Sequence, residues 1–275
     1  YVKDVAKRKK DEAAVKGHNS RSFRGKKLTK ALHEGKKDGS CTLILTEGDS
    51  AATFAIKGLK VVGREKYGVF PLKGKPLNVR DVPLAKADAN EEIHAIIQIM
   101  GLEYGRKYKT VDGLRYGSIL ILADQDEDGS HIKALIINFV HKFWPSLAKM
   151  PGFVRAMATP QIVATPKRKG GKVQMFYSQE EYREWAANHD SGKYKIEYFK
   201  GLGSSEDPQI KYCFEHMDQN VSQFTWVSKD EHYTSYRPPK GTDHCLDAIT
   251  LMFSKGREDD RKRWLNTYDE SVYLN

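Results

Sequence analysis

The chain has 275 residues, 39% of them hydrophobic and 30% charged, which is enough apolar material for one large packed domain or two modest ones. No apolar run approaches the ~18 residues that a membrane-spanning helix needs, and three widely separated cysteines argue against a disulfide scaffold or a zinc knuckle. The formal net charge of +10 favours a polyanionic partner without identifying it.

Residues 1–40 hold much of this positive charge, in runs such as Lys7–Lys10, and four glycines interrupt any long helix there. A short helix is expected around Lys26–Glu34. A solvated linker and a polyanion-binding arm fit the run equally well, and we interpret it as a basic linker segment. Because the chain opens on Tyr1 and lacks an initiator methionine, we expect it to be a piece of a longer protein.

Between residues 41 and 158, short apolar runs alternate with longer amphipathic segments. This alternation predicts a parallel α/β sheet, because parallel strands are usually joined by helical crossovers. The strongest buried strand is Ser118–Ala123, and the clearest helix is Glu91–Met100. The other expected elements are a strand at Thr42–Leu45, strands or extended loops at Val61–Val62 and Tyr67–Leu72, a helix through Ala51–Gly58 capped by Asp49 or Ser50, and a helix at Ile132–Trp144 capped by Ser130.

After Pro151 the pattern changes to a hairpin followed by polar helices. Gln161–Thr165 and Val173–Tyr177 flank Arg168–Gly171, whose two glycines are typical of a turn between antiparallel strands. The later elements expected are a helix at Glu180–Asn188, a strand at Lys193–Phe199, and mostly helix from Asp207 onward with an irregular stretch at 236–239. The expected divisions are a core domain at 41–158, a hairpin and strand extension at 159–204, and a mostly helical connector at 205–275.

The two clearest strands both end in acid: Glu47 follows one and Asp124 the other, with Asp126 and Asp128 close behind. Functional groups in an open parallel sheet gather beyond the carboxyl ends of its strands. If these strands are neighbours, Glu47 comes close to the three aspartates, which alternate spacing on an extended segment would point the same way. Crowded carboxylates repel one another and their pKa values rise, a penalty that a divalent cation removes. All-oxygen ligands favour a hard ion, so the pattern predicts a Mg²⁺ site.

Two other interpretations of Asp124–Gly129 compete with a magnesium site. An EF-hand calcium loop opens with the same pattern, but it needs a preceding helix and a glutamate at its twelfth position, which here is Leu135. A plain acidic surface turn fits the motif alone, although the second acidic strand end at Glu47 weighs against it. The magnesium site is therefore favoured over both.

Glu47–Ala51, followed far downstream by Asp124–Ile132, resembles the Toprim signature of type IIA DNA topoisomerases. Lys66–Lys75 and the Asn78–Arg80 that follows it are similar to the DNA-contacting loop of the family's eukaryotic branch, and Tyr198–Gly203 is similar to a second DNA-proximal element. The similarity runs in the family's order from about residue 41 to beyond residue 264. It implies a Rossmann-like Toprim sheet, parallel with flanking helices, followed by a smaller α+β and helical segment.

The resemblance also implies roles for the four acids. Glu47, Asp124 and Asp126 would be the catalytic residues and would hold one Mg²⁺ near the scissile phosphate. Asp126 and Asp128 would hold a second ion against the neighbouring backbone, and Mn²⁺ or Ca²⁺ could substitute for either. Glu47 would also serve in proton transfer at the 3′ oxygen of the DNA.

Positions that match the family's DNA-contacting elements are expected to lie against the duplex. Their lysines would contact phosphates, which adds affinity but little sequence reading, and their glycines would let the backbone approach DNA closely. These positions are Asp49, Lys73, Gly74, Lys75, Asn78, Lys200, Gly201 and Gly203. Eukaryotic members usually have arginine where this chain has Lys73, so the charge is kept while the bidentate fork is lost. Pro76 stands where an apolar side chain is usual and stiffens the loop.

The family's cleaving tyrosine is expected outside this chain. It lies on a downstream winged-helix domain and follows an arginine, whereas Arg115–Tyr116 occurs inside the Toprim region. The family's upstream ATPase module is also missing, and no Gly-x-x-x-x-Gly-Lys loop occurs here. The resemblance thus implies part of a homodimeric, ATP-dependent nuclear enzyme, with a mitochondrial or viral origin left open. Such an enzyme cuts both strands of double-stranded DNA, passes a second duplex through and reseals the break.

Two other functions remain open at this point. A Toprim-type nuclease or primase would use the same metal ions for different chemistry. A non-catalytic DNA-binding module would use the acids only to hold a structural ion. The segments Pro71–Lys75 and Lys200–Gly203 favour the topoisomerase over a primase or nuclease, because those enzymes have no evident need for them.

Overall fold

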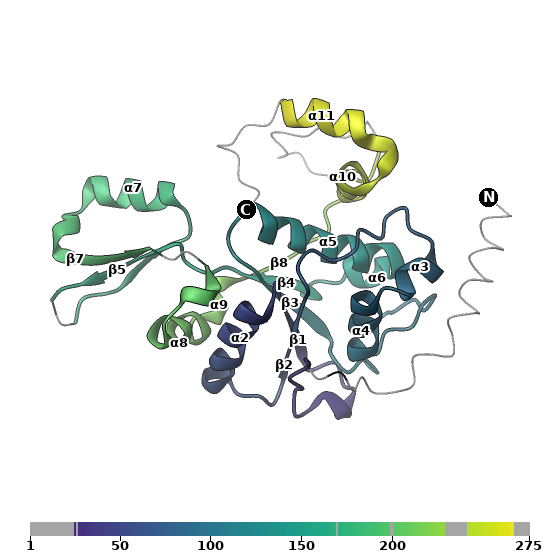
Figure 1. The fold of residues 1–275 in the computed structure, drawn as a ribbon, viewed down its shortest axis with the longest axis horizontal. Coiled ribbons are helices and arrows are strands. Elements are labelled where there is room, and N and C mark those ends of the chain that lie inside the picture. The colour runs from purple at the N-terminus through teal and green to yellow at the C-terminus, as the bar shows by residue number, and fades with distance from the viewer. Residues whose placement is uncertain (1–24, 26, 169, 199–200, 229–240, 267–275) are drawn as a thin grey trace.

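The computed structural model describes residues 25, 27–168, 170–198, 201–228 and 241–266 (Figure 1). Its centre is a five-stranded sheet in the order β2-β1-β3-β4-β8, in which the first four strands are parallel and β8 runs antiparallel to β4. The strands are β1 (Thr42–Thr46), β2 (Tyr67–Pro71), β3 (Ser118–Leu122), β4 (Val154–Met157) and β8 (Val221–Gln223). The predicted parallel α/β sheet is confirmed.

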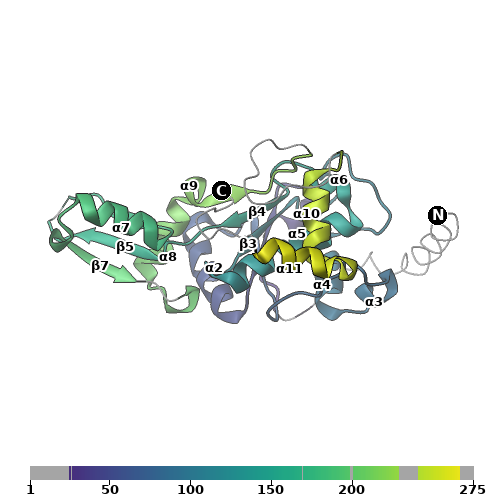
Figure 2. The same ribbon diagram turned by 90° about the horizontal axis from the view of Figure 1, so that it is seen from above.

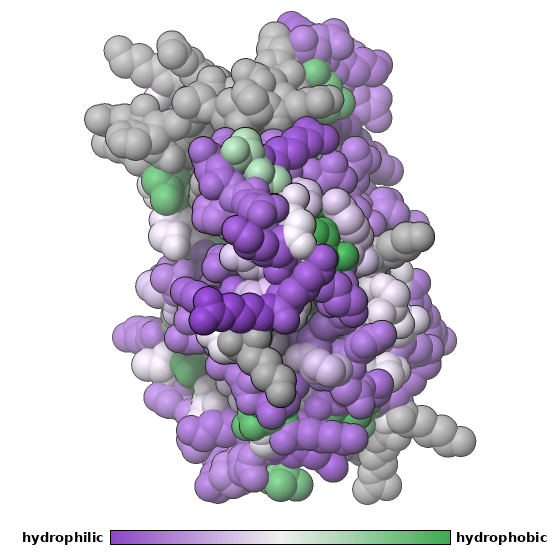
Figure 3. All heavy atoms as spheres, turned by 90° about the vertical axis from the view of Figure 1, so that its left-hand side faces the viewer, coloured by the Kyte–Doolittle hydropathy of each residue, from purple (hydrophilic) through white to green (hydrophobic). Residues whose placement is uncertain are grey.

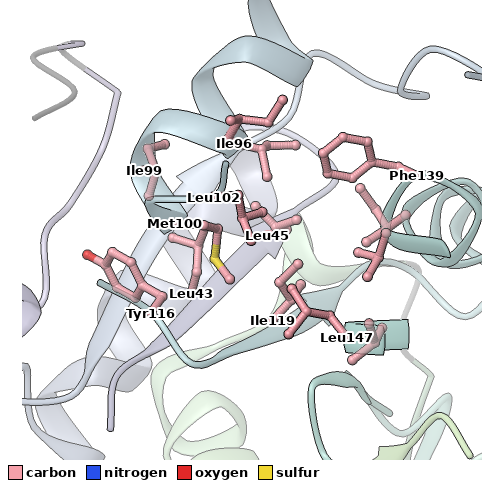
Figure 4. Close-up of a cluster of buried hydrophobic side chains, with 14 of the residues drawn as sticks. Leu43, Leu45, Ile96, Ile99, Met100, Leu102, Tyr116, Ile119, Phe139 and Leu147 are labelled. Carbon is pink, nitrogen blue, oxygen red and sulfur yellow. The ribbon is translucent and has the colours of Figure 1, made fainter. Parts of the chain in front are cut away.

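Successive side chains along β1 and β3 point to opposite faces of the sheet, and both faces are buried. Leu43, Leu45 and Ile119 share one face and its hydrophobic cluster (Figure 4), whereas Ile44 and Leu120 belong to a second cluster on the other face. The first face is covered by α4 (Glu91–Met100), α5 (Glu127–Phe143) and α6 (Pro145–Ala148), and the second by α2 (Asp49–Val62) and α8 (Asp207–Glu215). The strands therefore read as continuous apolar runs that stop where the chain leaves the core.

A smaller antiparallel sheet, β6-β5-β7, projects from one end of the core (Figures 1 and 2). Its elements are β5 (Ile162–Pro166), β6 (Gln174–Phe176), β7 (Tyr194–Tyr198) and the helix α7 (Gln179–Asn188). The pairing of β5 with β6 confirms the predicted hairpin. Tyr182 and Trp185 of α7 pack on Phe176 and cover one face of the sheet. Figure 3 views this end of the molecule, where hydrophilic residues dominate the surface.

The C-terminal helices return to the core. Ile249 and Phe253 of α10 pack against Leu135 of α5, and both ribbon views show α10 and α11 lying over α5 (Figures 1 and 2). The remaining elements are α3 (Leu84–Asp88), α9 (Met217–Asn220), α10 (His244–Phe253), α11 (Glu258–Asn266) and the 3-10 turns η1 (Glu34–Lys36), η2 (Ser191–Lys193), η3 (Leu202–Ser204) and η4 (Lys255–Arg257). Among the described helices, none combines the length and the apolar character that crossing a membrane requires.

Helix α2 differs from its predicted bounds at both ends. Gly48 occupies the N-cap position, so Asp49 is the first helical residue and neither it nor Ser50 is the cap. The helix continues through Val61–Val62, which the sequence places in a strand or an extended loop. It ends at Gly63, whose φ of 84° is a conformation that glycine adopts without strain. The apolar residues at its C-terminal end belong to a longer helix because Gly63, not Gly58, terminates it.

Two further expectations are corrected by tertiary pairing. The described part of Lys26–Glu34 forms turns in place of a helix, and Thr29 makes an antiparallel bridge to Val69 at the edge of β2. Val221–Gln223 forms β8 inside a segment expected to be mostly helical, because it pairs with the open edge of β4. The irregular stretch expected at 236–239 lies outside the described residues.

Gly58 marks the contact between α2 and α8, where an added Cβ would lie 2.1 Å from the ring of Phe214. That ring is buried and cannot easily move aside. Gly58→Ala should therefore destabilise the chain by about 1–3 kcal/mol, even though alanine is the better helix former. Urea unfolding followed by circular dichroism measures the change. Gly35→Ala is the control, because a Cβ there meets nothing within 4 Å, and an equal loss in both variants would contradict this packing explanation.

Candidate metal centre and nucleic-acid interface

The pairing of β1 with β3 brings the first two acids together. The strands are parallel neighbours, with Thr46 opposite Leu122 at the end of the register. The Glu47 N–H donates to the Leu122 carbonyl at 3.3 Å, and the Asp124 N–H donates to Glu47 Oε2 at 3.3 Å. Glu47 and Asp124 therefore meet at the carboxyl edge of the sheet, as the sequence predicts for neighbouring strands.

The three aspartates do not share one extended segment, because α5 begins between them. Asp126 is the N-cap of α5, and its Oδ1 accepts a hydrogen bond of 2.7 Å from the Gly129 N–H. The helix starts at Glu127, so Asp128 lies in its first turn. The predicted cap at Ser130 is therefore wrong, because Ser130 lies inside the helix. The free N–H groups of a helix N-terminus favour carboxylates there. The cap and the first turn of α5 thus hold these two acids beside the strand ends.

Glu47 experiences the negative charge of the three aspartates. Burial is the largest cause that raises the pKa of its carboxyl, the charges of Asp124, Asp126 and Asp128 raise it further, and the hydrogen bond from the Asp124 N–H opposes them. Within the described part of the chain, no three His, Cys, Asp or Glu side chains are already gathered as a metal cluster. The donors nevertheless fit a hard divalent ion, because all four are carboxylates whose repulsion a positive charge relieves.

A cation already lies against one of these acids: Lys75 Nζ is 2.6 Å from Asp128 Oδ1. Lys75 follows Gly74 in the loop after β2, and the φ of 101° at Gly74 is a left-handed conformation that glycine tolerates. The loop thereby extends to the N-terminus of α5. The ammonium occupies a position where the acids attract positive charge, which supports a cation site here.

The segment at 201–203 is bound to one of these acids, Asp124. The Leu202 N–H donates to Asp124 Oδ1 at 2.8 Å. Gly201 has a φ of 141°, and an added Cβ there would lie 2.9 Å from Asp124 Oδ2. Gly203 approaches Ser50 so closely that an added Cβ would lie 3.2 Å from the Ser50 Cβ. Gly201 is therefore needed for packing against Asp124, and Gly203 packs closely on the first turn of α2. Lys200 lies outside the described residues.

The other predicted DNA-facing residues make contacts within the chain. Lys73 Nζ lies 3.0 Å from Glu91 Oε2 on α4, and Lys27 Nζ lies 3.2 Å from Asp49 Oδ1. The Asn78 side chain donates to the Phe253 carbonyl at 2.9 Å and accepts from Asn138 at 3.1 Å. This geometry gives Asn78 a role in joining its loop to α10 and α5, and its contact with DNA stays a prediction.

Sequence reasoning missed the acid and the lysine that pair with the predicted DNA-facing residues. Lys27 resembles its basic neighbours in sequence, and Glu91 resembles any acid at the start of a helix. Lys133 is also close to the site, where its Nζ donates to Gln125 Oε1 at 3.3 Å. Burial lowers the pKa of Lys133, and the charge of Asp126 offsets only part of that effect. No local pattern separates these residues from solvated ones, because their partners are distant in sequence.

Glu47→Gln should stabilise the metal-free chain at neutral pH. A carboxyl whose pKa is raised on folding binds its proton more tightly in the folded state, so its ionisation opposes folding. This cost is absent below the ordinary pKa of 4.5 and grows as the pH rises through the higher folded pKa. Because solvent screens a partly buried side chain, the gain should be at most about 1 kcal/mol. Thermal unfolding in EDTA measures it, and an equal gain at pH 7 and pH 4 would contradict this explanation.

Comparison with known proteins places this geometry in a family. Residues 42–158 match the Toprim domain, and residues 157–275 match the C-terminal associated domain of TOPRIM. DNA topoisomerase 2 of Acanthamoeba polyphaga mimivirus is 45% identical over 289 residues, covering 91% of this chain and 23% of the relative. DNA topoisomerase 2 of Bombyx mori is 45% identical over 277 residues, covering 97% of this chain and 17% of the relative.

A solved structure agrees with this assignment. The crystal structure of the Plasmodium falciparum topoisomerase II DNA-binding, cleavage and re-ligation domain has a TM-score of 0.80 and 43% identity, covering 93% of this chain and 33% of that one. The chain spans less than a quarter of the length of the two relatives above. Residues 42–158 belong to the Toprim domain family and residues 157–275 to its C-terminal associated domain, so the chain corresponds to the Toprim region of eukaryotic-type DNA topoisomerase II.

Proposed function

We propose that this chain supplies the magnesium-binding half of a composite DNA-cleavage site in an ATP-dependent type II DNA topoisomerase. The observation that carries the proposal is the meeting of Glu47 with Asp124 at adjacent strand ends, beside Asp126 and Asp128 at the N-terminus of α5. The loops at 73–75 and 201–203 flank these acids and make contacts with them. A phosphate backbone lying along this edge would meet acids, lysines and glycines together.

The acids divide into two proposed ligand sets. Glu47, Asp124 and Asp126 would hold one Mg²⁺, and Asp126 and Asp128 would hold a second, with Mn²⁺ or Ca²⁺ able to replace either. When bound, the ions would stabilise charge on the leaving 3′ oxygen and fix the phosphate geometry. Asp126 is suited to serve both sets, because its Oδ1 accepts from Gly129 and the helix cap fixes its carboxylate.

The chain's own groups would bind and orient DNA and move a proton. Glu47 has a raised pKa, so its Oε2 is suited to exchange a proton with the 3′ oxygen. Lys73, Lys75 and Lys200 would contact phosphates, and Asp49 would lie near them. Gly74, Gly201 and Gly203 would allow close backbone approach.

The rest of the reaction would come from other parts of the full enzyme. A tyrosine on a winged-helix domain of the partner protomer would attack the phosphate, so the enzyme would act as a homodimer. An ATPase module would drive passage of a second duplex through the break, and only the full-length enzyme would bind ATP. We propose the nucleus as its compartment, although the similar proteins include one named mitochondrial and one from a virus.

Asp126→Ala in the full-length enzyme should reduce Mg²⁺-dependent double-strand cleavage about 100-fold or more, because Asp126 serves both ions and a metal contributes several kcal/mol. Cleavage of supercoiled plasmid, trapped with denaturant, measures the effect. Asp259→Ala is the control, because its exposed side chain pairs only at the surface of α11 with Lys262. Undiminished cleavage by the Asp126 variant would overturn the assignment.

The products of the unmodified enzyme distinguish the competing functions. A topoisomerase gives relaxed plasmid and, when trapped, protein joined to the 5′ ends of the DNA. Free ends would instead indicate a nuclease, and RNA synthesis a primase. If Asp124→Ala left DNA binding and catalysis unchanged and altered only stability, the acids would hold a structural ion.

A further inference from the structure

Three described lysines on or beside the candidate DNA face form ion pairs with acids of the chain itself. Lys27 is paired with Asp49, Lys73 with Glu91 and Lys75 with Asp128, at distances of 3.2, 3.0 and 2.6 Å. Of these three acids, only Asp128 belongs to the proposed metal ligands. Asp128 is therefore both the ion-pair partner of a proposed DNA-binding lysine and a proposed ligand of a metal ion.

We propose that Lys75 and the second divalent ion compete for Asp128, so that metal binding releases Lys75 to a DNA phosphate. In the metal-free chain, Lys75 acts as an internal counterion of the acidic site. Once displaced, it becomes an available cation on the loop after β2. The proposal rests on the proposed function and adds to it a residue that couples metal binding to DNA binding.

The two cations cannot share Asp128 without strong repulsion. Magnesium binds carboxylate oxygens at about 2.0–2.1 Å, and Lys75 Nζ lies 2.6 Å from Asp128 Oδ1. An ion on the same oxygen would thus stand within about 5 Å of the ammonium, and one on the other carboxylate oxygen within about 7 Å. Like charges repel appreciably at both separations, because both are shorter than the Debye length of about 8 Å. The divalent ion has the greater charge and also gains from Asp126, so it should be the one that stays.

Lys75 is the partner that can move. Its side chain is 44% exposed, so water can solvate the displaced ammonium, and an exposed ion pair of this kind is weak. The space beside Gly74 is open, because an added Cβ there meets nothing within 4 Å. Asp128 is also exposed, at 63%, but its side chain is shorter than that of lysine and its backbone lies in the first turn of α5. Displacement would therefore swing the lysine and leave the acid in place.

Coupling of this kind acts in both directions. If the metal frees Lys75 for DNA, then a phosphate that captures Lys75 must raise the affinity of the acids for metal by the same factor. Metal would consequently bind more tightly once DNA is in position. The other two lysines lack this property, because Asp49 and Glu91 are not proposed metal ligands.

The test measures Mg²⁺ affinity of the 275-residue chain without DNA by isothermal titration calorimetry. Lys75→Met keeps most of the side-chain length and removes the competing charge, so it should tighten Mg²⁺ binding about two- to fivefold, the range that an exposed ion pair is worth. Lys57→Met is the matched control: Lys57 is 43% exposed and lies 2.7 Å from Asp207, outside the site. It should leave the affinity unchanged within about 1.5-fold, because distant exposed charges are screened.

A second measurement follows the coupling itself. Binding of a labelled DNA duplex is compared with and without Mg²⁺ at constant ionic strength. The unmodified chain should gain DNA affinity with Mg²⁺, and Lys75→Met should lose about two- to fivefold of that gain, matching its change in Mg²⁺ affinity. Lys75→Arg keeps a movable charge and should retain most of the gain. Circular dichroism confirms that each variant is folded.

The outcomes separate this inference from the function on which it rests. Equal Mg²⁺ affinity in the unmodified chain and Lys75→Met, with binding abolished by Asp126→Ala, would overturn the competition and leave the metal site standing. Equal tightening by Lys75→Met and Lys57→Met would also overturn it, because general charge would then be the cause. If Asp126→Ala bound Mg²⁺ as the unmodified chain does, the proposed metal site would fall, and the inference with it.

Discussion

The parallel pairing of β1 with β3 is the constraint on which the candidate site depends. Both strands are central and buried on both faces, so their register is fixed by packing as well as by hydrogen bonds. A shift of one residue would turn Leu43 and Ile44 to the wrong faces and move Glu47 away from Asp124. The register ends at Thr46 and Leu122, so the acids that follow lie at the carboxyl edge of the sheet, outside the buried core. The stability of the core and the placement of the acids are thus set by one interaction.

The site concentrates negative charge where the fold can tolerate it. Two of the acids lie at the N-terminus of α5, which offers N–H donors and a favourable dipole, and Asp124 accepts from the Leu202 N–H. Glu47 accepts a longer hydrogen bond, of 3.3 Å from the Asp124 N–H, and the pKa of its carboxyl is raised. Lys75 supplies positive charge to Asp128 from outside the helix. This arrangement fits the proposed cation site, because the charges of the three aspartates still raise the pKa of Glu47.

Segments distant in sequence hold the loops that flank the acids in place. Asn78 joins the loop after β2 to α10 through the Phe253 carbonyl, and Asp81 accepts from the Lys255 N–H at 2.7 Å. These contacts connect the C-terminal helices to the loop that carries Lys73 and Lys75. A change in the position of α10 would therefore reach the lysines through hydrogen bonds. The small sheet is tied to the site in a similar way, because the chain leaving β7 leads to the loop that binds Asp124.

The sequence by itself determined strands at Thr42–Leu45 and Ser118–Ala123, each within one residue of the observed bounds. It also determined their parallel arrangement and the acids beyond their ends, because apolar runs, helical crossovers and abrupt polar stops are local signals. It determined family membership through motifs in a fixed order. Only the tertiary structure decided that Asp126 caps α5, that Val221–Gln223 completes the sheet, and that Lys75 contacts Asp128. A cap depends on where the backbone turns, an edge strand on which partner lies open, and an ion pair on two loops meeting in space. None of these is encoded within a short window of sequence.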